Sequence, residues 1–352
     1  MSHFSPHTGV SFEGYYSKFR LASGSSIALI VSAVPAAAHN LEAKQIQEKR
    51  AFMISFTYVQ VDSKKWYQKE YWPAAFDIER HPGGMGFRIK WDQGEFGWDG
   101  LTKKVWWTLN TEHLKFSSET GVGSRVEWIK GQPTSTPAGW LARLPLPIQW
   151  DVHSLDSKCQ YRLDIHDDEA ESDLFVRSDG EGSGHVHTEK NWAYSFPDSY
   201  IWIQARDHER GHGVCLAGGS LIPGVQAFLV GYDHPQFPVT FRPPESTSIF
   251  GLSLGLTSDI SYASRRVVID IRGWFSRIRI TADAPSDTFF TFAAPLHTGH
   301  APDYATQSFG ANIHVKTWTR TWPWSRWTEI TEEKFERGSL EFGGGFYKSH
   351  AD

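Results

Sequence analysis

Alternation of apolar and polar residues with a period of two is the feature that most constrains how this chain can fold. Residues i and i+2 of a strand share one face of a sheet, so each alternating run predicts a half-buried strand. The runs are short and are bounded by clusters of Gly, Pro, Asp or Ser. Many short strands with regular turn signals predict an all-β sandwich or barrel. The clearest runs are AFMISFTYVQV (51–61), FRIKW (87–91), YIWIQA (200–205), VVIDI (267–271) and RIRIT (277–281).

Helical periodicity is scarce. LEAKQIQEKR (41–50) is compatible with a helix, and TEEKFERG (331–338) is compatible with a short terminal turn. A chain of 352 residues favours two domains of ordinary size. The acidic and then Gly-rich stretch 166–184 is the best linker candidate, which predicts β domains over 1–175 and 176–352. Because small-molecule sites are common at domain junctions, we expect a ligand pocket at or near this one.

Composition excludes several classes of protein. The formal net charge is −5 and no block of Lys and Arg is present, so a nucleic-acid partner is not expected. The longest apolar stretch, 27–38, contains Ser32 and Pro35 and is shorter than the roughly 20 residues of a membrane span, so stable membrane insertion is not expected. Two cysteines, Cys159 and Cys215, and the lack of a signal-like N-terminus favour a cytoplasmic protein. No pattern indicates an oligomeric state.

Aromatic residues are unusually frequent, with 16 Trp beside 23 Phe and 12 Tyr. They either fill β cores or line a cavity for an apolar ligand, and composition alone leaves both interpretations open. The chain has no Gly-x-Ser-x-Gly elbow, phosphate loop or dinucleotide fingerprint. We therefore expect no cofactor.

Two histidine patterns suggest a metal site. HERGH (208–212) matches the H-E-x-x-H zinc pattern, but it follows an alternating run and contains Gly211, so a hairpin turn is the favoured interpretation. His185 and His187 would share one face of a strand, and Glu189 falls on that face as the third ligand that a metal would need. The spacing of the residues that follow matches no known metal motif. We expect no metal. A metal enzyme built on His185, His187 and His212 stays open as an alternative, which bound zinc and inhibition by a chelator would reveal.

The stretch HVHTEKNWAYSFPDSYIWIQ (185–204) contains the best candidates for catalytic residues, with two His, a Glu, a Lys, an Asn and two Trp. In its last part Tyr200, Trp202 and Gln204 fall on one strand face, and Ile201 and Ile203 fall on the other. A carboxylic acid beside aromatic walls has a raised pKa, which suits a general acid near neutral pH. Glu189 is the candidate for that acid. The alternative interpretation makes Glu189 and Lys190 an exposed pair before a turn, with Trp192 in the core.

Three main stretches resemble motifs of the tocopherol cyclase family and follow the same order along the chain, and a fourth is similar in its glycine spacing. EKNWAYSFPDSYIWIQ (189–204) resembles its Glu-Lys-Asn-Trp-Gly run, which precedes Phe-Pro and a Trp-rich strand ending in Gln. PHTGVSFEGYYSKF (6–19) is similar to its Pro-His-x-Gly and Phe-Glu-Gly-Trp-Tyr-Phe-Lys signature. SLEFGGGFY (339–347) is similar to its C-terminal Gly-Gly-Gly strand, and GGSLIPG (218–224) has a similar Gly-Gly spacing. The resemblance spans nearly the whole chain.

The resemblance implies two lipocalin-like β domains, a scaffold also used by some cofactor-free Diels-Alderases of natural-product pathways. Related carotenoid hydratases have a Tyr-x-Asp-x-Asn-x-Gly version of the central motif, whose acidic residue is thought to protonate a carbon-carbon double bond. By position this role is implied for Glu189, with Asn191 following it. His187 stands where that version has Tyr, and Ala193 stands where it has Gly.

The implied activity is a cofactor-independent cyclase that closes an oxygen heterocycle on a small apolar, terpenoid-linked phenol or quinone methide. Glu189 would protonate a prenyl alkene, aromatic rings would face the cation, and His187, His7 or Glu13 would accept the phenolic proton. A hetero-Diels-Alder addition on the same scaffold is one alternative, and a non-catalytic carrier of an apolar ligand is another. The expected catalytic residues are Glu189, His187 and Asn191, and the expected substrate-binding residues are Trp192, Tyr200, Trp202, Gln204, Tyr15, His7 and Glu13.

Overall fold

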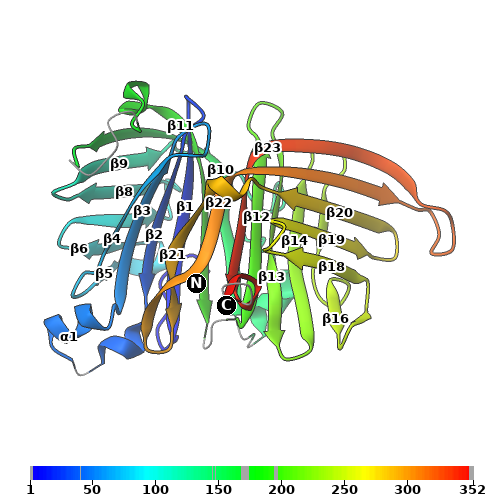
Figure 1. Ribbon diagram of the computed structural model, residues 1–352, viewed down its shortest axis with the longest axis horizontal. Coiled ribbons are helices and arrows are strands. Elements are labelled where there is room, and N and C mark those ends of the chain that lie inside the picture. Colours follow the sequence, from blue (N-terminus) through cyan, green and yellow to red (C-terminus); the bar gives the residue numbers. More distant parts are fainter. Residues whose placement is uncertain are drawn as a thin grey trace. The chain divides into compact units, whose positions relative to one another are not determined.

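The computed structural model describes residues 3–39, 41–144, 146, 148–167, 174–193 and 197–348. The chain is almost entirely β and has a two-domain lipocalin-like fold, as the alternation predicts (Figure 1). It divides into two compact units that are discontinuous in sequence. The first unit contains residues 1–136, 148–196 and 295–301, and the second contains 137–147, 197–294 and 302–352. The domain boundary expected at 175/176 stays a prediction, and residues 168–173 of the expected linker lie outside the described residues.

The first unit is built on an antiparallel sheet, which has 11 strands among the described residues. Adjacent strands of this sheet are often distant in sequence, since β1 pairs with β11. Taken in spatial order, its strands are β4 (Trp66–Tyr71), β3 (Phe52–Val59), β2 (Ser26–Ala33), β1 (Phe12–Leu21), β11 (Glu181–Ala193), β10 (Ile148–Ile165), β9 (Leu114–Thr120), β8 (Val105–Asn110), β7 (Gly94–Asp99), β6 (Gly86–Trp91) and β5 (Asp77–Arg80).

One face of this sheet forms an aromatic-rich core, and we call it the inner face. Alternate residues of most strands contribute to it, including Phe19 of β1, Phe56 of β3 and Trp107 of β8. The N-terminal segment contributes as well, because Phe4 is fully buried in the same core. The opposite, outer face carries the intervening residues of each strand.

The second unit is built on another antiparallel sheet, with 12 strands in the part of the chain that the structure describes. Its order is β17 (Leu252–Ser253), β16 (Thr247–Ile249), β14 (Val225–Asp233), β13 (His212–Ile222), β12 (Ser199–Asp207), β23 (Thr328–Gly344), β22 (Gly299–Thr319), β20 (Ser276–Asp283), β19 (Arg266–Arg272) and β18 (Leu256–Ser261), with β15 (Val239–Phe241) on β14 and β21 (Phe289–Leu296) on β22.

The core of the second unit is mainly aliphatic, with fewer aromatic residues than that of the first unit. Ile201 and Ile203 of β12 are fully buried in it, as the alternation of YIWIQA predicts. The predicted strands VVIDI and RIRIT form β19 and β20, and their isoleucines fill the same core. The long strands β22 and β23 form a hairpin whose tip lies beyond the ends of β18 to β20 (Figure 1).

Helical segments are short. The helix expected within 41–50 is confirmed as α1 (Ala43–Glu48), and a further turn, α2 (Gly345–Lys348), ends the described chain. The turn expected over 331–338 is wrong, because this stretch lies inside β23, where Phe335 pairs with Ile313 of β22 and packs into the core. No helix in the described ranges has the length and apolarity needed to cross a bilayer. The remaining helical pieces are the 3-10 turns Pro35–Ala38, Pro82–Gly84, Gly139–Arg143, Arg177–Asp179 and Ser286–Thr288.

Candidate active site

Strand β11 presents two different sets of polar residues on its two faces. Its register with β1 is regular over ten pairs, so even and odd positions point to opposite sides. Val186, Lys190 and Trp192 lie on the inner face, and His187 and Glu189 lie on the outer face. The exposed Glu189–Lys190 pair of the alternative interpretation is therefore wrong, since both side chains are buried and point in opposite directions.

The outer face holds a buried His187–Glu189 pair. His187 Nε2 lies 2.8 Å from Glu189 Oε2, and His187 Nδ1 lies 3.4 Å from the carbonyl oxygen of Leu155. A carbonyl oxygen only accepts hydrogen bonds, so Nδ1 carries a proton and donates it to Leu155. The second contact then needs one more proton, either on Nε2 of an imidazolium or on Oε2 of a carboxylic acid. In both cases the pair holds one transferable proton between these two atoms.

Asn191 lies beside this pair over a glycine of the neighbouring strand. Gly14 of β1 pairs with Asn191, and a Cβ on Gly14 would lie 2.9 Å from Asn191 Oδ1 and 3.5 Å from Ser32 Oγ. The glycine of the Phe-Glu-Gly signature therefore makes room for the Asn191 amide. Ser32 in turn contacts His300, whose Nε2 lies 2.8 Å from Ser32 Oγ.

His300 is a buried histidine that no sequence motif indicated. Its backbone N–H donates to the carbonyl oxygen of Arg50 at 3.0 Å, and its Nδ1 lies 2.6 Å from the same oxygen. Burial lowers its pKa to about 4, so the ring is neutral at physiological pH. Nδ1 thus donates to Arg50, and Nε2 accepts from the hydroxyl of Ser32.

The inner face holds a second cluster, centred on Lys190. Its ammonium is completely buried and lies 2.6 Å from Glu13 Oε1. The same ammonium donates to the backbone oxygen of Ser5, and His7 Nδ1 lies 2.9 Å from both Lys190 Nζ and Glu13 Oε1. Burial lowers the pKa of Lys190 to about 8, although Glu13 opposes the shift. Burial alone would raise the pKa of Glu13, but its hydrogen bonds with His7 and Lys190 outweigh burial and lower the pKa below its ordinary value.

Trp192 and Tyr15 were expected to face a substrate cation beside Glu189. The structure places both rings on the inner face, where the Lys190 ammonium lies 5.1 Å from the Trp192 ring centroid and 4.9 Å from that of Tyr15. His7 stacks on Trp192 with ring centroids 4.3 Å apart. These rings therefore already contact a cation of the protein itself, and their role toward a substrate stays a prediction.

Asp151 and His153 of β10 are inner-face residues that the sequence analysis missed. Asp151 pairs with Lys190, and burial raises its pKa to about 6 even though Arg125 and Lys190 lie nearby. His153 stacks on Phe4 with ring centroids 3.9 Å apart, and burial lowers its pKa well below its ordinary value. The only available signal was a carboxylate and a histidine inside the strand-like run QWDVHSLDS (149–157).

The second unit contains the other expected substrate-binding residues. Tyr200, Trp202 and Gln204 share one face of β12, opposite the aliphatic core, and Trp202 and Gln204 are buried. Burial and the neighbouring Glu341 carboxylate raise the pKa of Tyr200 well above its ordinary value. Glu341, which the sequence analysis missed, accepts a 2.8 Å hydrogen bond from Gln307 Nε2.

Gly343 shows what the Gly-Gly-Gly stretch does locally. It pairs with Tyr200, and a Cβ at this position would lie 2.0 Å from the tyrosine ring. The glycine therefore lets the ring lie flat across β23, which is close strand packing rather than a ligand contact.

HERGH forms the turn that its glycine predicted. β12 ends at Asp207 and β13 begins at His212, and Asp207 Oδ1 accepts hydrogen bonds from the backbone N–H groups of Glu209 and Arg210. Gly211 has a φ of 70°, a conformation that favours glycine. The two histidines are consequently not on a helix, so the zinc-protease geometry is not formed.

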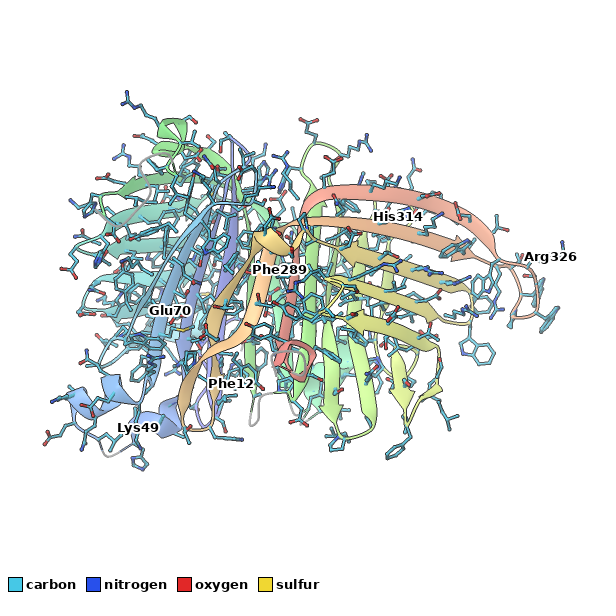
Figure 2. The ribbon with its side chains drawn as sticks, in the orientation of Figure 1. Phe12, Lys49, Glu70, Phe289, His314 and Arg326 are labelled. Atoms are coloured by element: carbon cyan, nitrogen blue, oxygen red, sulfur yellow. The ribbon has the colours of Figure 1, made fainter. Side chains whose placement is uncertain are left out.

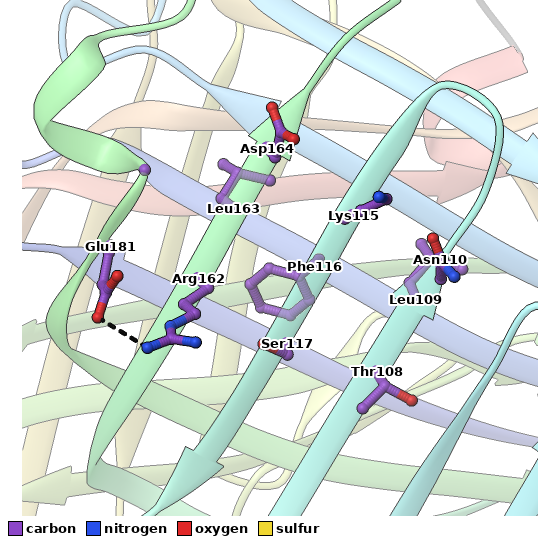
Figure 3. A pocket seen from close by; sticks show the side chains of 11 residues that line it. Thr108, Leu109, Asn110, Lys115, Phe116, Ser117, Arg162, Leu163, Asp164 and Glu181 are labelled. Carbon is purple, nitrogen blue, oxygen red and sulfur yellow. Dashed lines mark hydrogen bonds and ion pairs between the residues drawn. The ribbon is translucent and has the colours of Figure 1, made fainter.

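A groove of about 500 Å³ crosses strands β8, β9 and β10 of the first unit (Figure 3). Its labelled side chains are mostly polar, and the figure shows the ion pair between Arg162 and Glu181, whose atoms lie 3.3 Å apart. Both side chains are well exposed to solvent. A groove that is open to solvent does not exclude water from a reactive cation, so we do not place the reaction there.

Comparison with known proteins gives similarity of fold only. No family model matches the chain, and no curated protein matches its sequence. The crystal structure of CghA matches with a TM-score of 0.60 at 8% identity and covers 95% of this chain and 87% of that chain. A structure of CghA with Sch210972 matches with a TM-score of 0.53 at 8% identity, covering 95% and 88%. Kievitone hydratase from Nectria haematococca has a TM-score of 0.47 at 8% identity, covering 97% and 90%, too low a score to carry an argument.

The similarity to CghA covers nearly all of this chain, so the two-domain lipocalin-like fold is shared along its length. An identity of 8% transfers no activity and no residue role. Any functional conclusion must therefore come from the clusters described above and from the motifs.

Proposed function

We propose that this protein is a cofactor-independent cyclase that closes a chroman or pyran ring on a prenylated or terpenoid-linked phenol or quinone methide. The observation that carries the proposal is the buried His187–Glu189 pair, with its proton held between Nε2 and Oε2. The motifs that resemble tocopherol cyclases, and the fold shared with CghA, support the same class of protein.

The proposed reaction is an isomerisation that consumes no proton overall. Glu189 Oε2 gives its proton to one alkene carbon of the prenyl group, which forms a C–H bond and leaves a tertiary cation on the other carbon. The phenol oxygen attacks this cation and forms the C–O bond. The phenolic proton then returns to the His187–Glu189 pair, which is ready for the next turnover. Burial of the pair excludes the water that would otherwise trap the cation as an alcohol.

A hetero-Diels-Alder addition is the second candidate, and the same pair supports it. Here the proton stays on the pair and polarises the carbonyl of a quinone methide through a hydrogen bond, while the site orients the two reacting partners. Reaction in heavy water separates the two mechanisms. Alkene protonation leaves one deuterium on carbon in the product, and cycloaddition leaves none.

Glu189→Gln tests the proposal. Glutamine keeps the shape and a hydrogen-bond donor but has no acidic proton, so turnover of prenylated phenols should fall by roughly 100-fold or more, as is typical when a general acid is lost. The matched control is Glu181→Gln, at an exposed position on the same strand, which should retain wild-type turnover. Wild-type turnover in Glu189→Gln would contradict the acid mechanism. Tight ligand binding with no product above the uncatalysed rate would show a carrier instead.

A further inference from the structure

The second unit exposes a group of large apolar side chains at the tips of two neighbouring loops. Loop 273–275 joins β19 to β20, and loop 320–327 joins β22 to β23. Trp322 and Trp324 are 60% and 82% exposed, and Trp274 and Phe275 are 67% and 51% exposed. Single exposed apolar residues are ordinary, but four large aromatic residues on adjoining loops form a patch that calls for an explanation. We call these four residues the tip patch.

Hydrogen bonds hold the two loops side by side. The backbone N–H of Arg320 donates to the carbonyl oxygen of Phe275 at 3.0 Å, and Arg320 Nε donates to that of Trp274 at 2.8 Å. Thr319 Oγ1 donates to Phe275 as well, at 3.0 Å. The patch is therefore a fixed feature of the fold, carried at the end of the β22–β23 hairpin, where Figure 2 labels Arg326.

Among the residues that the structure describes, no cation lies above the exposed Trp322 and Trp324 rings, unlike the rings beside them. Arg277 lies 4.5 Å from the Trp318 ring centroid, and Arg320 lies 4.2 Å from that of Trp327. Trp322 and Trp324 instead stack on each other, with centroids 5.7 Å apart. Their outer faces are left to the surroundings.

A third loop extends the apolar surface. The backbone N–H of Arg272 donates to the carbonyl oxygen of Gly255 at 2.9 Å, which places the Gly255 end of segment 250–255 beside loop 273–275. This segment, which includes the two-residue strand β17, exposes three more large apolar side chains, Phe250, Leu252 and Leu254.

The charge of these loops indicates what covers the patch. Loop 320–327 contains Arg320 and Arg326 but no Asp or Glu. Arg272, at the end of β19, does not add to this charge, because it forms a 3.4 Å ion pair with Asp270. Tryptophan concentrates at membrane interfaces, and nearby arginines attract anionic headgroups. A contact between two copies of the chain would bring these cations against each other. We propose that the tip patch docks the protein on the surface of an anionic lipid bilayer. This proposal does not depend on the proposed reaction.

The test is co-sedimentation of the full chain with lipid vesicles, with tryptophan emission as a second readout. The wild-type protein should bind vesicles of phosphatidylcholine and phosphatidylserine, with a blue shift in emission, and should bind pure phosphatidylcholine more weakly. The double variant Trp322→Ala/Trp324→Ala should lose roughly tenfold or more in partitioning, because two large apolar side chains no longer enter the interface. Arg326→Gln should lose about fivefold on the anionic vesicles only, the effect of one cation near such a surface.

Trp140→Ala is the matched control, since Trp140 is 61% exposed but lies in another segment of the second unit. Its partitioning should equal that of the wild type, and urea unfolding should show that every variant is folded. Failure of the wild type to bind anionic vesicles would overturn the proposal, as would undiminished binding by the double variant. A wild-type dimer in light scattering that becomes a monomer in the double variant would identify a second copy as the occupant and would equally overturn it.

Discussion

Replacing Asp151 by Asn should stabilise the protein at neutral pH, although it removes a charge from a strand that pairs with Lys190. Burial raises the pKa of Asp151 from its ordinary 3.8 to about 6. The folded state therefore binds this proton more tightly than the unfolded state does. A shift of about two units, at about 1.4 kcal/mol each, makes the ionised form cost about 3 kcal/mol of folding free energy.

The sign of the pH dependence follows from the raised pKa. Well below pH 3.8, the ordinary pKa of this carboxyl, Asp151 is protonated in both states, and the cost is absent. Stability is lost as the pH rises from 4 to 6, and the full cost remains above pH 6. Asparagine resembles the protonated acid at every pH. Asp151→Asn should therefore match the wild type near pH 3 and exceed it by about 3 kcal/mol near pH 7.

Urea unfolding followed by tryptophan fluorescence at several pH values measures this difference, provided that the m-value is unchanged. Subtracting the two curves cancels all groups that titrate equally in both proteins. Asp164→Asn, at an exposed position on the same strand, should give a profile parallel to the wild type. A loss of stability in Asp151→Asn at pH 7, or a difference that does not change with pH, would refute the assignment of a buried, costly carboxylate.

Two further substitutions test the clusters on either face of β11. Glu13→Gln should lower the free energy of unfolding in urea by about 3–5 kcal/mol, because it leaves the Lys190 ammonium buried without its carboxylate. Adding Lys190→Met should recover much of this loss. Additive losses in the double-mutant cycle would show that the two residues are not coupled. Gly14→Ala should lower turnover with little change in stability, since its Cβ would lie 2.9 Å from Asn191 Oδ1, at the end of a side chain that can move. Unchanged turnover would show that Asn191 has no role. The control is Gly121→Ala, whose added Cβ would have no atom closer than 3.7 Å.

The strands of this fold were predictable because a period of two is a local property of the sequence. YIWIQA, VVIDI and RIRIT place their aliphatic residues in the core as expected. The error at 331–338 has a non-local cause: charged residues there favour a helical turn, but pairing with β22 and burial of Phe335 override that preference. The grouping of strands into units depends on such pairings too, and no local signal indicates that β1 lies beside β11.

The candidate site was predictable in its residue types and less so in its arrangement. Alternation alone places His187 and Glu189 on one face of a strand, and the structure adds the contact between them. The raised pKa of Asp151 depends on burial and on neighbours from other segments, Arg125 and Lys190, which a single sequence does not reveal. His300 approaches Ser32 from more than 260 residues away in sequence, as their hydrogen bond shows.

The pairing of β1 with β11 gives a physical reason for two separate motifs to occur together. Burying Glu189 and Lys190 side by side in sequence is costly unless each has its own partner, because adjacent strand residues point to opposite faces and do not reach each other. Glu189 finds His187 two residues away on its own face. Lys190 depends on Glu13 from the other motif.

A second contact between the two motifs is the pairing of Gly14 with Asn191, since the glycine leaves the space that the Asn191 amide fills. Phe-Glu-Gly in β1 and Glu-Lys-Asn in β11 are thus two halves of one structural unit. Loss of the Glu13 carboxylate should therefore be tolerated only with a matching change at Lys190.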